Sequence, residues 1–159
     1  MSKSFDHIVK KQFEYLLKDF HFRLELCKKI RGRYDILYVS DICAVHIVYE
    51  IREAYLFITL HKLQNGIFVD NPRPIKPDSL LTGYSLNDIL LLRAPHAVIR
   101  PAYSYGAKSE YYDKEHGLSL YVSKFADNLK SHAADVLVGD FKIFDVLEPI
   151  VKKRAQQNK

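Results

Sequence analysis

The apolar residues of this chain change their spacing at Phe20, and this change constrains the fold more than any other feature. Before Phe20 they recur every three or four residues, which is the period of one face of a helix. We therefore expect a helix over residues 5–19, with Ser4 as its N-cap. From Phe20 onwards apolar and polar residues alternate, which is the period of a half-buried strand. The apolar stripe of the helix consists of Phe5, Ile8, Val9, Phe13, Leu16, Leu17 and Phe20.

Further runs of β-branched and aromatic residues follow, separated by short polar connectors. Connectors this short permit only hairpins, so the strands should form an antiparallel meander. A short edge strand is expected at residues 67–69, before Pro72 and the prolines after it end the sheet. One core should combine Phe5, Phe13 and Leu16 with Leu56, Ile58 and Leu60. The main strands are predicted over residues 20–27, 34–40, 42–50 and 54–63.

The residue pattern of the C-terminal half predicts helices. Residues 85–88 (SLND) resemble a capping box that opens a short helix, and Pro95 must end it. Helical spacing returns from Leu118 to Leu137, Gly139 suits the end of that helix, and Asp140 can cap a last one. These patterns predict an α+β fold. It should have an N-terminal helix, an antiparallel four- to five-stranded meander, and C-terminal helices packed on the sheet, all within one domain spanning residues 1–159 with a basic tail at 152–159.

Both sides of the predicted sheet are apolar. In the run 54–63, Leu56, Ile58 and Leu60 occupy one side, while Tyr55, Phe57, Thr59 and His61 occupy the other. In a sheet with one face in water, apolar and polar residues should alternate more regularly along each strand. We expect the second side to be covered by the proline-rich segment 72–77 and the segment 94–110, in preference to another molecule.

The chain is basic, with 24 Lys and Arg against 19 Asp and Glu. Four of the cations lie at positions 152–159, which leaves residues 1–151 nearly neutral. A nucleic-acid-binding protein needs several cations on one face. That alternative therefore depends on the basic turn 28–33, the segment 93–108 and the C-terminal tail.

The sequence contains no recognisable metal or cofactor site, and we expect neither to be bound. His46 and Glu50 would be about 13 Å apart in a strand, too far to share an ion. The glycines are scattered singly, so no phosphate-binding loop is formed. Cys27 and Cys43 both lie in predicted strands and are expected to be reduced packing residues.

One long segment is a candidate binding surface. Residues 93–108 combine cations and aromatic residues, and long connections in compact domains are often functional. Arg and Tyr are also enriched at binding hot spots. The candidate residues are Arg93, His96, Arg100, Tyr103, Tyr105 and Lys108, possibly joined by Arg73 of the proline-rich segment.

Four segments of the chain resemble a group of small bacterial α+β proteins of uncharacterised function. These are residues 20–22 (FHF), 45–52 (VHIVYEIR), 84–90 (YSLNDIL) and 134–141 (ADVLVGDF). Some proteins of this appearance are immunity proteins of polymorphic or contact-dependent toxins. The resemblance implies a non-enzymatic protein that binds a protein partner, such as a cognate toxin.

Three hypotheses follow. The first is an immunity-type inhibitor, the second a nucleic-acid-associated protein, and the third an enzyme whose site assembles from scattered polar residues. Neither a signal peptide nor a membrane span is recognisable, so we expect a cytoplasmic location and no membrane partner.

Overall fold

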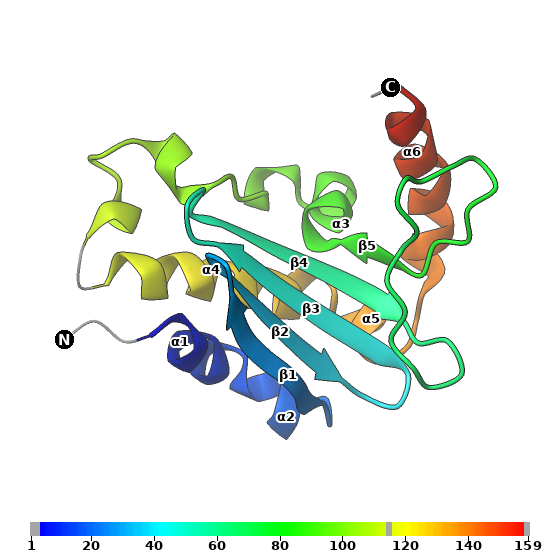
Figure 1. The fold of residues 1–159 in the computed structure, drawn as a ribbon, viewed down its shortest axis with the longest axis horizontal. Coiled ribbons are helices and arrows are strands. Elements are labelled where there is room, and N and C mark those ends of the chain that lie inside the picture. The colour runs from blue at the N-terminus through cyan, green and yellow to red at the C-terminus, as the bar shows by residue number, and fades with distance from the viewer. Residues whose placement is uncertain (1–3, 114–115, 158–159) are drawn as a thin grey trace.

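A computed structural model describes residues 4–113 and 116–157. Its strands form one antiparallel sheet in the order β1-β2-β3-β4-β5, and α1, α4 and α5 lie behind it (Figure 1). The α+β fold with an N-terminal helix, a meander and C-terminal helices is thus confirmed. The strands are β1 (Arg23–Ile30), β2 (Arg33–Val39), β3 (Cys43–Glu50), β4 (Tyr55–Lys62) and β5 (Gly83–Ser85).

Two of the predicted helices are divided. The helix predicted over residues 5–19 is interrupted at Phe13, and the helix predicted over residues 118–137 is interrupted at Ala133. Within the described residues, no helix combines the length and the apolar character needed to cross a membrane. The α-helices are α1 (Phe5–Gln12), α2 (Glu14–Lys18), α3 (Leu86–Arg93), α4 (Gly117–His132), α5 (Ala134–Leu137) and α6 (Lys142–Gln157); the 3₁₀ turns are η1 (Pro95–Ala97), η2 (Ala102–Tyr105) and η3 (Glu110–Tyr112).

The core lies between the sheet and the helices. Phe13 and Leu16 are fully buried there, and Tyr121 and Phe125 of α4 cover the centre of the layer. Burial of this apolar surface supplies most of the favourable free energy of folding. The predicted core is confirmed: Phe5, Phe13, Leu16, Leu56, Ile58 and Leu60 all belong to it.

The first strand differs from the prediction. It begins at Arg23, after His21 adopts a positive φ of 62°. A bulge between Leu24 and Leu26 then shifts the register. Leu24 consequently pairs with Tyr38, whereas Leu26 pairs with the next residue along β2, Leu37, so the predicted alternation from Phe20 does not hold.

The predicted edge strand at residues 67–69 is wrong. Ile67 forms only an isolated bridge with Gln64, and the chain then runs through residues 68–82 before it pairs with β4 as β5. Three residues are too few to show a period of two, and for this reason the sequence pattern does not reveal β5.

The sheet face that carries Arg33, His46, Val48, Glu50 and Phe57, here called the open face, has no helix of the described residues against it (Figure 1). Phe68 of the β4–β5 connection packs on one end of it, over a small cluster that contains Leu37, Val39, Ala44 and Leu63. At the other end Phe57 is 41% exposed and Ile30 of β1 is 44% exposed. The expected cover is therefore only partial, and the segment 94–110 contributes none of it, because it lies along the β4 side and the end of the sheet (Figure 1).

The expected basic tail is mostly helical, since residues 152–157 belong to α6. Lys152 contacts Glu148 at 2.9 Å, and Arg154 binds both carboxylate oxygens of Asp88 at 2.8 and 2.9 Å. These two cations are thus paired with acids of the fold. Lys159 lies outside the described residues.

Both cysteines are free thiols. Cys27 lies on β1 and Cys43 on β3, with β2 between them. Burial raises the pKa of the Cys43 thiol to about 12. It is therefore a protonated packing residue at neutral pH.

Candidate functional site

The predicted binding residues do not form one surface. Arg73 lies in the β4–β5 connection, on the right of Figure 1, whereas η2 lies at the opposite end of the molecule. His96 lies in η1 between these two ends, and both His96 and Lys108 are exposed. The structure therefore distributes the predicted residues over several elements.

The Arg93 side chain joins the end of α3 to the α4–α5 junction. Its guanidinium binds both carboxylate oxygens of Asp135 at 2.7 Å and the His132 carbonyl at 2.6 Å. The hydrogen bonds from Arg93 lower the pKa of Asp135, although partial burial opposes this shift. The geometry gives Arg93 a structural role.

Arg100 and Tyr105 fix the segment between η1 and η2. The Arg100 guanidinium lies 4.6 Å from the centroid of the Tyr105 ring, and the Arg100 amide donates to the Tyr105 hydroxyl at 3.0 Å. Tyr121 of α4 donates to the Arg100 carbonyl at 2.9 Å. These contacts hold the following turn, η2, against the end of the sheet.

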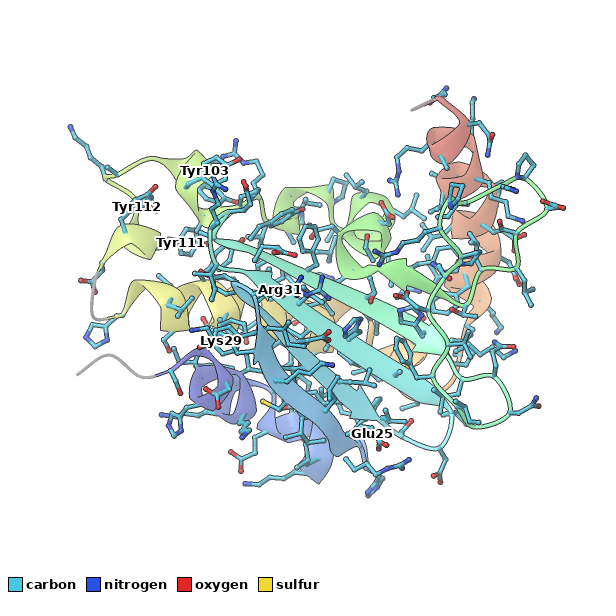
Figure 2. The ribbon with its side chains drawn as sticks, viewed as in Figure 1. Glu25, Lys29, Arg31, Tyr103, Tyr111 and Tyr112 are labelled. Carbon is cyan, nitrogen blue, oxygen red and sulfur yellow. The ribbon has the colours of Figure 1, made fainter. Side chains whose placement is uncertain are left out.

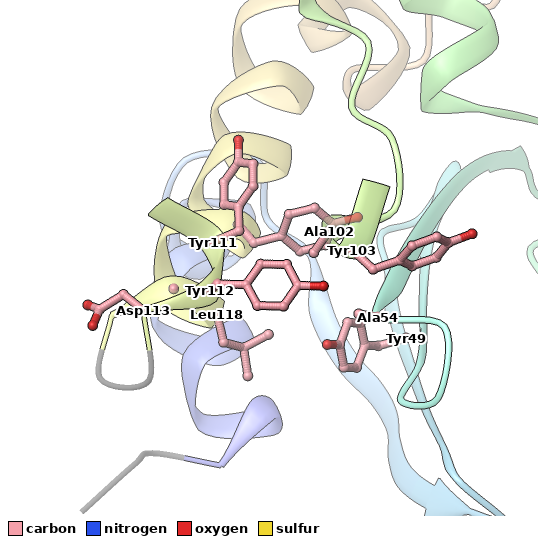
Figure 3. Close-up of a pocket in the computed structure, with 10 residues that line it drawn as sticks. Tyr49, Ala54, Ala102, Tyr103, Tyr111, Tyr112, Asp113 and Leu118 are labelled. Carbon is pink, nitrogen blue, oxygen red and sulfur yellow. The ribbon is translucent and has the colours of Figure 1, made fainter. Parts of the chain in front are cut away.

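A cavity of about 250 Å³, here called the tyrosine cavity, lies where η2, η3 and α4 meet the end of β3 (Figure 3). Tyr112 points across it toward Tyr49, while the carboxylate of Asp113 points away. Its lining is Tyr49, Ala54, Ala102, Tyr103, Tyr111, Tyr112, Asp113, Gly117, Leu118 and Tyr121. The walls are thus aromatic and largely uncharged.

Gly117 makes the cavity possible. A Cβ atom at this position would lie 2.2 Å from the Tyr111 carbonyl oxygen, which no side chain can tolerate. The first residue of α4 therefore has to be glycine for η3 to pack this closely. This contact places Tyr111 edge-on against Tyr121, with ring centroids 5.2 Å apart.

The tyrosines differ in exposure. Tyr103 and Tyr112 at the mouth are 53% and 47% exposed, whereas Tyr49 and Tyr121 are buried. Burial raises the pKa of the Tyr49, Tyr111 and Tyr121 hydroxyls. They are therefore neutral at physiological pH, and the cavity suits a side chain with an apolar body and a hydrogen-bonding tip.

Basic turns lie beside the cavity. Ile51 donates to the Gly32 carbonyl at 3.0 Å, and Ala102 donates to the Ala54 carbonyl at 3.0 Å, so the two hairpin turns and η2 meet at one end. Lys29 and Arg31 lie at the same end of the molecule as Tyr103 (Figure 2). The basic turn 28–33 is thereby placed near the tyrosine cavity.

Sequence reasoning identified Tyr103 but missed the other four tyrosines of the cavity. The sequence analysis placed Tyr121 in the helical run 118–137 and Tyr49 in the predicted strand 42–50, and it named neither as a binding residue. Both belong to the core. The Tyr111-Tyr112 pair was a usable signal, because paired tyrosines in a long connection are unusual core residues. Among the residues that the structure describes, no group of three or more His, Cys, Asp or Glu is arranged to hold a metal ion.

Comparison with known proteins finds no family model, no curated protein and no solved structure that matches this chain.

Proposed function

We propose that this protein binds another protein and that the tyrosine cavity is its anchor site. The observation that carries the proposal is the pair of exposed tyrosines, Tyr103 and Tyr112, at the mouth of a preformed, largely uncharged cavity. Tyrosine offers a large contact area with little loss of side-chain entropy, and such residues dominate binding hot spots. The exposed Arg31 and Arg52 on the neighbouring turns favour a partner with acidic groups around its anchor.

More specifically, we propose that this protein acts in the cytoplasm as an immunity-type inhibitor of a bacterial toxin. Its support is the resemblance of residues 20–22, 45–52, 84–90 and 134–141 to small bacterial proteins of that kind. An inhibitor needs only a stable complex, so it needs no reacting groups in the cavity. The aromatic lining of the cavity meets this requirement.

The test uses the protein encoded by the neighbouring reading frame as the candidate toxin. Co-expression should restore growth of a host that produces this toxin, and calorimetry should detect the complex. The double substitution Tyr103→Ala and Tyr112→Ala should weaken binding by roughly thirtyfold or more. Lys124→Ala, on the exposed face of α4, is the matched control.

Two results would contradict these proposals separately. A complex that forms without restoring growth would remove toxin inhibition but keep protein binding. Unchanged affinity of a normally melting double variant would show that the tyrosine cavity is not the anchor site.

Nucleic-acid binding is the second candidate, because Arg31 and Lys29 lie at the same end as several tyrosines (Figure 2). Two other cations are already engaged: Arg33 contacts Asp35 and Glu50, and Arg154 binds Asp88. A salt titration with RNA and DNA oligonucleotides separates the candidates. Binding that falls steeply between low and physiological salt supports this second function, and no binding at low salt removes it.

A further inference from the structure

The outer edge of β1 is unpaired. β1 is the first strand in the sheet order, and no strand of the described residues lies on its other side (Figure 1). An edge strand presents backbone N–H and C=O groups that can pair with another chain. β1 has eight residues, whereas β5, at the opposite end of the sheet order, has three. β1 is therefore the longer of the two edge strands.

The hairpin turn shows how the backbone of β1 is oriented. β1 and β2 are joined by Arg31 and Gly32, which both have positive φ angles, 46° and 81°. Next to a two-residue turn of this kind, the flanking residues exchange both of their backbone hydrogen bonds. Ile30 and Arg33 are these flanking residues, so the backbone groups of Ile30 point toward β2.

Bonded and unbonded residues alternate from this turn back along β1. Lys28 therefore also bonds to β2, whereas the N–H and C=O groups of Cys27 and Lys29 point away from the sheet. The bulge near the start of β1 interrupts the alternation. Residues 26–30, here called the regular edge, are thus the part of β1 that can accept a further strand without distortion.

The side chains of the regular edge lie on both faces of the sheet. Leu26 packs against the small cluster of the open face, and Cys27 packs against the main core behind the sheet. Successive side chains of a strand point to opposite faces, and this fixes the remaining positions. The open face therefore carries Leu26, Lys28 and Ile30, and the other face carries Cys27 and Lys29.

The cations at this edge lack acidic partners. Lys28, Lys29 and Arg31 are all exposed, and no acid of the described residues forms an ion pair with any of them. Asp35 lies opposite Lys28 on β2, but its carboxylate contacts His46. The regular edge is thus positively charged on both faces of the sheet.

We propose that the regular edge binds an extended acidic segment of a partner protein, which adds to the sheet as a sixth strand. The outward backbone groups of Cys27 and Lys29 form the ladder, and the pairing is antiparallel, which is the more stable direction. Carboxylates of the segment lie opposite Lys28 on the open face and Lys29 on the other face. Apolar side chains lie opposite Leu26 and Ile30.

Charge and backbone together select this occupant. Opposite charges directly across an antiparallel pair stabilise it, and like charges destabilise it. A second copy of this chain would bring further lysines to the same edge. The phosphates of a nucleic acid carry no proton for the outward C=O groups. The regular edge shares no residue with the lining of the tyrosine cavity, so the two contacts are separate.

The test is an NMR titration of the full chain with the peptide Thr-Val-Glu-Glu-Thr-Val-Thr, blocked at both ends. In the antiparallel alignment its glutamates lie opposite Lys29 and Lys28, and its valines lie opposite Ile30 and Leu26. Binding should be saturable. It should also slow the hydrogen exchange of the Cys27 and Lys29 amides, because these amides gain hydrogen-bond partners.

Matched peptides test the charges and the ladder separately. Replacing both glutamates by lysine should weaken binding by roughly tenfold, because two attractive pairs become repulsive. N-methylation of the first glutamate removes an N–H that faces β1 and should weaken binding by roughly fivefold or more. N-methylation of the second glutamate, whose N–H points away from β1, should leave the affinity unchanged.

Variants assign the binding to this edge. The double substitution Lys28→Glu and Lys29→Glu should reverse the preference, so that the lysine peptide binds more tightly than the glutamate peptide. Lys124→Glu on the exposed face of α4 is the matched control and should leave the preference unchanged. Circular dichroism establishes that the double variant is folded, and Lys28→Glu alone replaces it if it is not.

Four results would overturn the proposal: no saturable binding of the glutamate peptide at millimolar concentration, equal binding of the lysine peptide, equal effects of the two N-methylations, or a double variant that still prefers glutamate. A dimer of the free chain that protects the same amides, or an oligonucleotide that does so, would assign the edge to that partner instead. The peptides contain no aromatic residue to fill the tyrosine cavity, whose partner is tested separately.

Discussion

His61 shows how a single buried residue sets the pH dependence of this fold. The Thr82 hydroxyl donates its proton to the Val69 carbonyl at 2.7 Å, so His61 Nδ1, 3.2 Å from Thr82 Oγ1, has to be the donor in that contact. His61 Nε2 then accepts from Thr59 at 3.1 Å. A second proton on the ring would lie on Nε2 and reverse this last bond, so that the Thr59 hydroxyl would have to accept.

We predict that stability falls on acidification because of His61. Burial lowers its pKa to about 4, so between pH 6.5 and 4 the unfolded chain binds a proton that the folded chain does not. The stabilisation is fully present above pH 6.5, and a loss of about 3 kcal/mol of unfolding free energy is complete below pH 4. Urea unfolding from pH 8 to 4 measures it. His61→Gln should reduce the dependence of the unfolding free energy on pH in this window. An unchanged dependence would mean that other groups cause it.

At the scale of elements, α3 depends on its N-cap. Ser85 Oγ accepts from the Asp88 amide at 3.0 Å. We predict that Ser85→Ala lowers the unfolding free energy by about 1 kcal/mol, because one amide of the first turn loses its partner. Urea denaturation measures the change, with the exposed Ser131→Ala on α4 as control. A Ser85→Thr variant that is no more stable than Ser85→Ala would contradict a capping role.

Local signals such as this cap are readable in the sequence, while the arrangement across strands is not. The Ser85–Asp88 spacing and the positive φ of Gly139 each follow from a few neighbouring residues. The contact of Asp35 with His46 depends on the register of β2 against β3, which no periodicity encodes. The same holds for the tyrosine cavity: Tyr103 lies in a long connection and was predicted, but Tyr49 comes from a strand and Tyr121 from a helix.

At the scale of the whole molecule, the sheet is stabilised mainly from one side. We predict that Leu56→Ala costs about 2–5 kcal/mol of unfolding free energy, because Leu56 is fully buried beneath the helices. Phe57→Ala, its neighbour on the open face, should cost about 1 kcal/mol or less, since much of that side chain already lies in water. Guanidinium denaturation compares the two. Equal losses would mean that the open face is packed in solution.

The order of the sheet also determines how the chain can assemble it. Neighbours from β1 to β4 are joined by turns of two to four residues, so each hairpin can form while little chain entropy is lost. β5 is the exception, because residues 63–82 must be looped back before three residues can pair. The pairing of β5 with β4 therefore costs the most chain entropy to form, and we expect it to be the first strand pairing that is lost. Its opening would expose the edge of β4 while leaving the hairpins from β1 to β4 intact.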